Sequence, residues 1–217
     1  MKIIRNSNLE QLPCVVTIGN FDGVHLGHQT LLAEVKKRAH VLKLESAVIT
    51  FEPNPKDYFS QNKPQTRISS LREKIELFNE IKIDRVHIIK FNQEFSKVSA
   101  NEFISILIKK LKVKEIVVGE DFCFGMGRKG SIKQLSASSM KLNIKNKILM
   151  DGKRISSTLI RNLLANDKLD EANKYIGRPY SISGKVVHGE KRGRKIGFPT
   201  ANIHMRHNRP PLKGVFA

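Results

Sequence analysis

The sequence contains little cysteine and no long apolar segment, and both absences restrict what the chain can be. Its two cysteines, Cys14 and Cys123, have no C-x-x-C spacing and cannot provide a disulfide framework. No stretch reaches the roughly 18 apolar residues of a membrane-spanning helix, and the first residues lack an apolar run of signal-peptide length. We therefore expect a soluble, cytoplasmic protein in a reducing compartment, without zinc and without a membrane partner.

Acidic residues are also scarce, with 20 Asp and Glu against 39 Lys and Arg, which gives a formal net charge of +19. Such an excess raises the question of nucleic-acid binding, because clustered basic side chains displace counterions from phosphate backbones. Here the basic residues are scattered over expected solvent faces of helices, as in residues 35–38 and 108–110. Small molecules are therefore the favoured partners, and no nucleic acid is expected.

Short apolar segments alternate with amphipathic segments of helix length, a pattern typical of an α/β fold with a doubly wound parallel sheet. The expected strands are residues 14–18, 47–51, 86–89, 115–118 and 147–150. The expected helices are residues 28–44, 70–81, 100–111 and 131–143, followed by a helical stretch over 157–176. In such a sheet, ligands bind at the carboxyl ends of the strands.

The pattern changes after residues 177–180, where glycine-rich, strand-like sequence begins. We place a boundary there, with one domain over residues 1–180 and an incomplete domain over residues 181–217. Roughly 37 residues without a disulfide or metal would be marginal as an independent domain. The sequence carries no indication of an oligomeric state.

The segment from Gly19 to His28 has the composition of a phosphate-binding corner between a strand and a helix. Glycines at positions 19, 23 and 27 let the backbone turn and an anion approach, and the free N–H groups of the helix start favour negative charge. His25 and His28 lie at the same corner, where imidazoles can donate hydrogen bonds to phosphate oxygens and, when protonated, add positive charge. A bare H-x-x-H pair is more often an incidental cap, but the surrounding glycines favour a site.

A second candidate site follows at Ser156, Ser157, Thr158 and Arg161. The hydroxyls stand at the expected start of a helix, and Arg161 falls on the same face as Thr158, where it can fork onto phosphate oxygens. Taken alone, these hydroxyls are explained equally well as a helix cap.

Residues 125–130 satisfy the G-x-G-x-x-G pattern of dinucleotide-binding oxidoreductases, with Asp151 at a suitable distance. However, residues 122–124 separate the glycines from the strand, and Arg128 and Lys129 would oppose the helix dipole. An oxidoreductase module is therefore the less favoured alternative.

Residues 19–32, GNFDGVHLGHQTLL, resemble the H-x-G-H signature of nucleotidyltransferases in its bacterial FAD synthetase form, and ISSTLIR over 155–161 is similar to the second signature of these enzymes. The resemblance implies a Rossmann-like domain that transfers the adenylyl group of ATP to FMN, with magnesium, FAD as product and pyrophosphate released. It implies that the catalytic residues are His25, His28 and Arg161. The nucleotide-binding residues that it implies are Gly19, Asn20, Phe21, Asp22, Gly23, Gly27, Ser156, Ser157, Thr158 and Arg161.

Two further segments resemble the flavin side of these enzymes. Residues 118–125 look like the flavin loop, and residues 50–55 resemble T-F-[ED]-P-H-P, with Asn54 in place of the histidine. Asn54 cannot titrate, which puts an acid–base role there in doubt. The implied flavin-binding residues are Phe51, Glu52, Pro53, Asp121, Phe122 and Phe124.

Residues 193–202 resemble the G-x-P-T-A-N segment of riboflavin kinases, in which the positions of Thr200 and Asn202 coordinate magnesium. The family's kinase barrel continues beyond this segment and carries its glutamate base there. We therefore expect no riboflavin phosphorylation by the 217-residue polypeptide, and FMN formation from riboflavin and ATP would contradict this. A non-catalytic, nucleotide-binding remnant is the remaining alternative.

Overall fold

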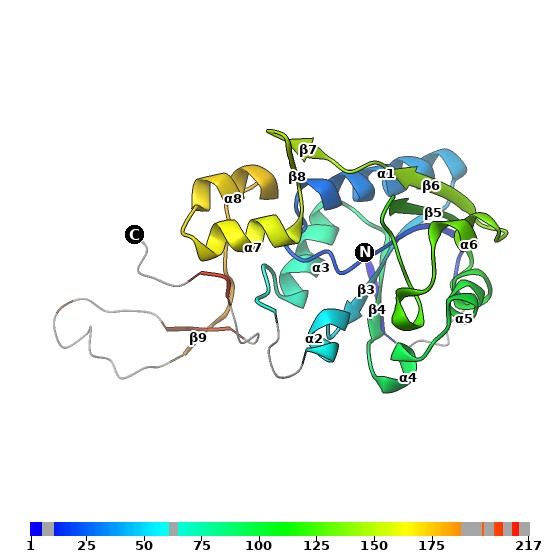
Figure 1. Cartoon of the computed structure of the whole chain (residues 1–217), viewed down its shortest axis with the longest axis horizontal. Helices are drawn as coiled ribbons and strands as arrows, with labels where there is room; N and C mark the ends of the chain where they lie inside the picture. Colours follow the sequence, from blue (N-terminus) through cyan, green and yellow to red (C-terminus); the bar gives the residue numbers. More distant parts are fainter. Residues whose placement is uncertain (6–10, 61–64, 188–196, 198–201, 206–209, 213–217) are drawn as a thin grey trace.

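The computed structural model describes residues 1–5, 11–60, 65–187, 197, 202–205 and 210–212. A six-stranded parallel sheet in the order β1-β4-β3-β2-β5-β6 forms its centre (Figure 1). Its strands are β1 (Lys2–Arg5), β2 (Cys14–Ile18), β3 (Glu45–Glu52), β4 (Arg85–Lys90), β5 (Val113–Gly119) and β6 (Lys141–Lys145). The expected α/β fold with a Rossmann-like parallel sheet is confirmed.

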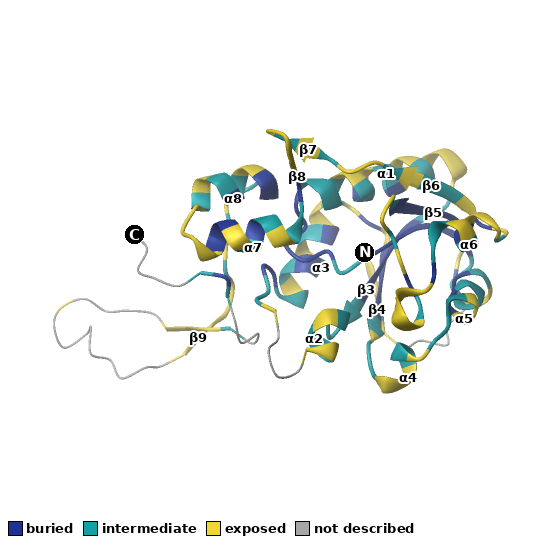
Figure 2. Cartoon of the chain, viewed as in Figure 1, coloured by how far each residue is buried: buried dark blue, intermediate teal, exposed yellow. Residues whose placement is uncertain are grey.

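The central strands are buried on both faces, as Figure 2 shows, because their apolar residues occupy both alternating positions. In β2, Cys14, Val16 and Ile18 join one apolar cluster and Val15 joins another. The first cluster is covered by α5 (Ala100–Ser105) and the π-helical turn Ile106–Lys110, and the opposite face by α1 (Leu26–Leu42) and α3 (Leu71–Glu80).

Local capping explains where the covering helices begin. Ser70 and Glu73 form a capping box at the start of α3, and Ser99 and Glu102 form another at α5. The second of these confirms the helix start predicted near residue 100. The short helices are α2 (Pro55–Phe59), α4 (Gln93–Ser96), the 3-10 turn Met126–Arg128 and α6 (Ile132–Ser136).

The predictions for residues 131–150 were correct only in part. The helix predicted over 131–143 is helical only in α6, and its last residues belong to β6, which pairs with β5 at the sheet edge. Its sequence KLNIK alternates polar residues with Leu142 and Ile144, and lysine on an edge strand protects against pairing with other chains. The strand predicted at 147–150 is instead the short β7 (Leu149–Met150), which forms a hairpin with β8 (Lys153–Arg154).

The helical stretch predicted over 157–176 is two helices, α7 (Ser157–Ala165) and α8 (Leu169–Ile176). The break occurs at Asp167, whose φ of 56° is incompatible with a continuing right-handed helix. The two helices pack together around buried Leu164 and Tyr175. The edge strand β1 was missed by the sequence prediction.

The strand order reverses between β2 and β5. From β2 the chain moves outward through β3 and β4, and it then returns to the opposite side of β2 to form β5 and β6. Such a reversal opens a crevice at the carboxyl ends of the two strands. The loops after Ile18 and Gly119 both lead into this crevice.

After residue 180, β9 (Lys185–Val187) and β10 (Asn202–His204) pair antiparallel, and both are exposed (Figure 2). The division into domains at residue 180 stays a prediction. Among the residues that the structure describes, no helix has the length and apolarity needed to cross a membrane.

Candidate active site

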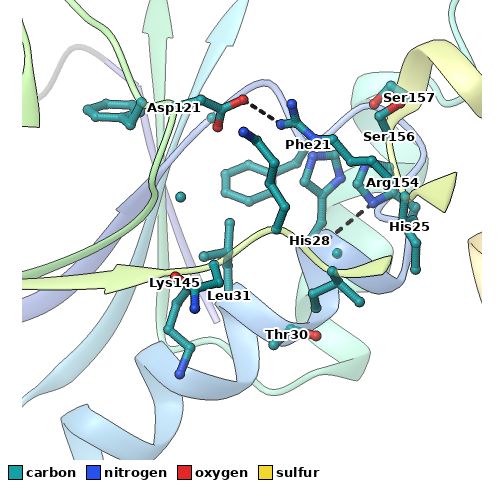
Figure 3. A pocket seen from close by; sticks show the side chains of 18 of the residues that line it. Phe21, His25, His28, Thr30, Leu31, Asp121, Lys145, Arg154, Ser156 and Ser157 are labelled. Atoms are coloured by element: carbon teal, nitrogen blue, oxygen red, sulfur yellow. Dashed lines mark hydrogen bonds and ion pairs between the residues drawn. The ribbon is translucent and has the colours of Figure 1, made fainter. Parts of the chain in front are cut away.

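The β2–α1 loop places two imidazoles in direct contact. His25 is the N-cap of α1, and its Nδ1 accepts a hydrogen bond from the backbone N–H of His28 at 3.3 Å. The two rings stack with centroids 3.6 Å apart, and Phe21 meets His28 edge-on at 5.1 Å (Figure 3). The helix start and the neighbouring aromatic ring thus fix both side chains.

Both imidazoles are held neutral. Desolvation lowers the pKa of His25 to about 4 against the opposing influence of the Asp22 carboxylate. Desolvation, followed by the proximity of His25, also lowers the pKa of His28 well below its ordinary value. Because Nδ1 of His25 accepts a hydrogen bond, its neutral ring carries the proton on Nε2. The pair can therefore donate hydrogen bonds to an anion at neutral pH without carrying a charge beforehand.

Asp22 holds the β2–α1 loop against the segment that precedes α3. Its carboxylate accepts hydrogen bonds from the backbone N–H groups of Ile68 and Ser69, both at 3.1 Å. The Ser69 hydroxyl in turn accepts from the N–H of Gly23 at 2.8 Å. These contacts fix a loop whose Gly23 has a φ of 82° and whose Val24 has a φ of 41°, in the left-handed region.

A polar cavity of about 330 Å³ opens in front of the histidines. The loop residues that line it include Gly19, Phe21, His25, Gly27 and His28, while Asn20 lines the neighbouring cavity. The opposite wall carries Lys145, Lys147 and Arg154, which form ion pairs with the carboxylates of Glu34, Glu120 and Asp121, respectively, and outnumber the one carboxylate that lines the cavity, Asp121. An anion is therefore the ligand that this cavity suits by charge.

The start of α7 closes one side of this polar cavity. Ser156 is the N-cap and accepts from the N–H of Leu159 at 3.2 Å, and the Ser157 hydroxyl donates to the Asp22 carbonyl at 2.9 Å. Both serines line the cavity. Thr158 is exposed and is not among the described residues that line it.

Arg161 contacts the β2–α1 loop and the segment before α3. Its Nε donates to the Thr66 carbonyl at 2.8 Å and its Nη2 to the Asp22 carboxylate at 2.7 Å. Arg161 is not among the described residues that line the polar cavity, and its role at phosphate oxygens stays a prediction. Arg154, which the sequence prediction missed, reaches across the cavity to Asp121 (Figure 3). Its place directly before the 155–161 motif was the signal that could have identified it.

A second cavity, of about 570 Å³, is aromatic. Of the predicted flavin residues, Phe51, Asp121, Phe122 and Phe124 line it. Glu52 forms an ion pair with Arg67 at 2.9 Å, and neither Glu52 nor Pro53 is among the lining residues that the structure describes. The phenylalanines that the prediction missed are Phe59, Phe91, Phe95 and Phe103.

The polar and aromatic cavities share a wall. Both are lined by Ile18 and Gly19 after β2 and by Asp121 and Phe122 after β5. A side chain at Gly19 would meet the Phe21 ring at 3.2 Å, so the backbone itself forms this part of the wall. Two different ligands can thus meet end to end at the reversal of strand order.

The other predicted motifs take different positions. The glycines of residues 125–130 form a tight turn closed by a bridge between Phe124 and Gly130, and no strand-to-helix corner exists there within the described chain. Asn54 caps α2 by accepting from the N–H of Lys56 at 3.0 Å. Thr200 lies outside the described residues, and Asn202 lies in the exposed β10.

Comparisons with known proteins give consistent findings. A family model described as FAD synthetase matches residues 7–159, and one described as riboflavin kinase matches residues 176–217. Proteins named bifunctional riboflavin kinase/FMN adenylyltransferase from Haemophilus influenzae and Escherichia coli are both 43% identical, and the chain covers 73% and 72% of their lengths, with 100% of the chain aligned. A crystal structure of a protein named macrolide-efflux protein from Streptococcus pneumoniae superposes with a TM-score of 0.82 at 30% identity, over 97% of this chain and 72% of that one.

Proposed function

This chain belongs to the bifunctional riboflavin kinase/FMN adenylyltransferase family, and from that premise we propose which of its residues join the two substrates. Its FAD synthetase domain transfers the adenylyl group of ATP to FMN and releases pyrophosphate. One observation carries the assignment of residues: the cavity lined by His25, His28 and Arg154 shares the wall at Gly19 and Asp121 with the aromatic cavity.

ATP binds in the polar cavity. Its phosphates lie against the start of α1, where His25 and His28 donate hydrogen bonds, and against the basic side chain of Arg154. Ser156 and Ser157 contribute from the start of α7, whose unpaired N–H groups also favour negative charge. We assign Arg161 a supporting role. It binds Asp22, whose hydrogen bonds hold the β2–α1 loop that carries His25 and His28, which we call the histidine loop.

FMN binds in the aromatic cavity. A planar isoalloxazine suits walls made of phenylalanine rings, such as Phe91, which meets Phe51 and Phe95 at centroid distances of 6.1 and 5.8 Å. The FMN phosphate extends toward Gly19, where the cavities join. This places it next to the α-phosphate of ATP.

The reaction is an in-line displacement at the α-phosphorus of ATP. A phosphate oxygen of FMN forms the new P–O bond, the bond from the α-phosphorus to the bridging oxygen breaks, and its electrons leave with pyrophosphate. His25 and His28 donate hydrogen bonds to the non-bridging oxygens as these gain negative charge. Positioning and electrostatics account for the catalysis, with no covalent enzyme intermediate.

The site fits a magnesium ion that arrives with ATP. Among the described residues no group of three or more His, Cys, Asp or Glu is arranged to hold a metal, so this part of the chain offers no cage of such ligands. Magnesium commonly binds through substrate phosphates and one or two carboxylates, and Asp121 lines both cavities at their junction. When bound, the ion would neutralise charge on the triphosphate.

The decisive experiment incubates the chain with FMN, ATP and magnesium and follows FAD and pyrophosphate. We expect turnover by the wild type and a loss of about 100-fold or more in kcat for His28→Ala, as for other removed donors to a developing oxyanion. His40, which lies in the last turn of α1, provides the matched control variant His40→Ala. Full activity of His28→Ala would contradict the assignment, and inactive wild type would favour the nucleotide-binding remnant.

A further inference from the structure

The segment after α8 packs against the β2–α1 loop that carries His25 and His28. At the end of α8, Gly177 takes a left-handed φ of 81° and passes close to the first turn of α1. A Cβ at this position would lie 2.5 Å from the Leu26 side chain, so only glycine allows the approach. The segment of residues 176–183, which we call the return segment, therefore lies directly against the loop that carries His25.

Arg178 of the return segment binds the backbone of this loop. Its Nη2 donates to the carbonyl of Gly23 at 2.8 Å and its Nη1 to the carbonyl of Val24 at 3.2 Å. These are the two peptide carbonyls that immediately precede His25. The Gln29 side chain adds a parallel link, since its Nε2 donates to the carbonyls of Val24 and Ile176, both at 2.9 Å.

A second anchor holds the far end of the return segment. The Glu73 carboxylate, which closes the capping box of α3, accepts hydrogen bonds from the N–H and hydroxyl of Ser183 at 2.8 and 2.7 Å. Its other oxygen accepts from the N–H of Ser70, next to the Ser69 that binds Gly23. The return segment thus spans from the histidine loop to the helix start that supports it.

The loop conformation requires such support. Val24 is β-branched and yet has a φ of 41°, a conformation that persists only when the surrounding structure imposes it. A guanidinium is suited to this task because its planar fork can bridge two oxygens at once. Its two bonds fix the peptides from which His25 emerges, and His25 in turn fixes His28 through the contact between Nδ1 and N–H.

We propose that Arg178 is a positioning residue for adenylyl transfer, acting through the carbonyls of Gly23 and Val24 on the stacked pair His25–His28. The proposal rests on the proposed function of that pair. Arg178 lies within residues 176–217, which match the riboflavin kinase model, so the geometry of the adenylyl-transfer site depends on a residue from the other family match.

The test compares Arg178→Ala with Arg72→Ala, an exposed arginine on α3 that pairs with Glu76. We expect kcat for FAD formation by Arg178→Ala to fall by about 10- to 100-fold, in line with small displacements of catalytic groups, while KM for FMN stays near wild type. Added guanidinium ion should restore part of kcat, and Arg178→Lys should fall between wild type and Arg178→Ala. Arg72→Ala should match wild type throughout.

Wild-type kcat in Arg178→Ala would overturn the proposal. A loss that tracks only the folded fraction, measured by thermal unfolding, and that guanidinium does not rescue would overturn it as well. If Arg178→Ala fails to fold, Arg178→Lys replaces it in the test: a lower kcat with an unchanged KM for FMN would support the proposal, and a wild-type kcat would overturn it. Parallel measurement of His28→Ala separates the two assignments: an unaffected His28→Ala overturns the catalytic role of the histidine, whereas an unaffected Arg178→Ala beside an impaired His28→Ala overturns only the positioning role.

Discussion

The polar and aromatic cavities are built in different ways, although they share a wall. In the polar cavity, polar groups have specific partners: His25 accepts from His28, and Ser157 donates to Asp22. In the aromatic cavity, rings meet edge to face at centroid distances such as 5.7 Å between Phe59 and Phe91. Directed hydrogen bonds fix positions closely, whereas ring contacts tolerate small shifts.

This difference assigns separate tasks to the two cavities. Transition-state stabilisation needs donors at fixed positions, which hydrogen-bonded loops provide. Binding of a flat apolar ring needs buried area, which the phenylalanines provide. Changes in the polar cavity should therefore affect turnover and the use of ATP, and changes in the aromatic cavity should affect the KM for FMN.

After His28→Ala, the largest effect should come from Arg154→Ala in the polar cavity. The change leaves Asp121 without its ion-pair partner and, in the proposed binding mode, removes a cation from beside the triphosphate, so that the like charges of Asp121 and ATP would repel. We expect kcat/KM for ATP to fall by about 100-fold, with the KM for FMN little changed. Steady-state kinetics with varied ATP measure this.

Lys153→Ala is the matched control, because Lys153 is exposed, adjacent in sequence and not among the described residues that line the polar cavity. It should retain wild-type kinetics. If Arg154→Ala changed only the KM for FMN, this result would contradict the separate roles of the two cavities.

Acid should lower the free energy of unfolding through two buried histidines. His25 lies in the β2–α1 loop and His87 in β4, and desolvation lowers the pKa of each to about 4 from 6.5. As the pH falls, each histidine takes up a proton in the unfolded chain before it does so in the folded chain. The contribution of its neutral form to the free energy of unfolding is therefore complete above pH 6.5 and is lost as the pH falls toward 4. At pH 5 the unfolding free energy should be lower by about 2 kcal/mol for each group.

His87→Leu provides the comparison for this acid effect. It should remove one contribution from the pH dependence of urea unfolding while leaving FAD formation at neutral pH near wild type, because His87 is not among the described residues lining either cavity. Equal acid sensitivity of the variant and the wild type would show that His87 titrates normally.

A smaller effect is expected for Phe91→Leu in the aromatic cavity. The ring of Phe91 contacts four other rings, those of Phe51, Tyr58, Phe59 and Phe95. Losing the contact that the Phe91 ring would make with the isoalloxazine in the proposed binding mode should raise the KM for FMN by up to about 10-fold, since an aromatic pair contributes about 0.5–1.5 kcal/mol beyond area. The kcat and the KM for ATP should remain near wild type, and a fall in kcat alone would contradict the division of tasks.

The sequence predicted those parts of the site that depend on local contacts. His25 capping α1 and Ser156 capping α7 involve partners three residues away, within one motif. The partner of Arg161 lies 139 residues away, and no spacing rule could connect it to Asp22. The ion pair of Arg154 with Asp121 was missed for the same reason.

The secondary structure, too, was predicted correctly only where local sequence determines it. Buried strands such as β2 were predicted with correct bounds because their apolar runs are continuous. The edge strand β6 was taken for helix because lysines interrupt its pattern, and only pairing with β5 makes it a strand. Tertiary contacts decide such segments, and they overrule local propensity.

The Arg154–Asp121 pair also determines how the polar cavity responds to different anions. A ligand must exchange places with Asp121, so its affinity reflects the difference between two ionic pairings and not the full strength of one. Because Arg154 and Asp121 are both about half exposed, at 47% and 50%, the pair that must be broken is weak. Lys145 and Lys147 are likewise paired, with Glu34 and Glu120, so each cation of this wall must exchange a carboxylate for the ligand. We therefore expect a single carboxylate to gain little from the exchange and a polyphosphate, which can replace several carboxylates at once, to bind better.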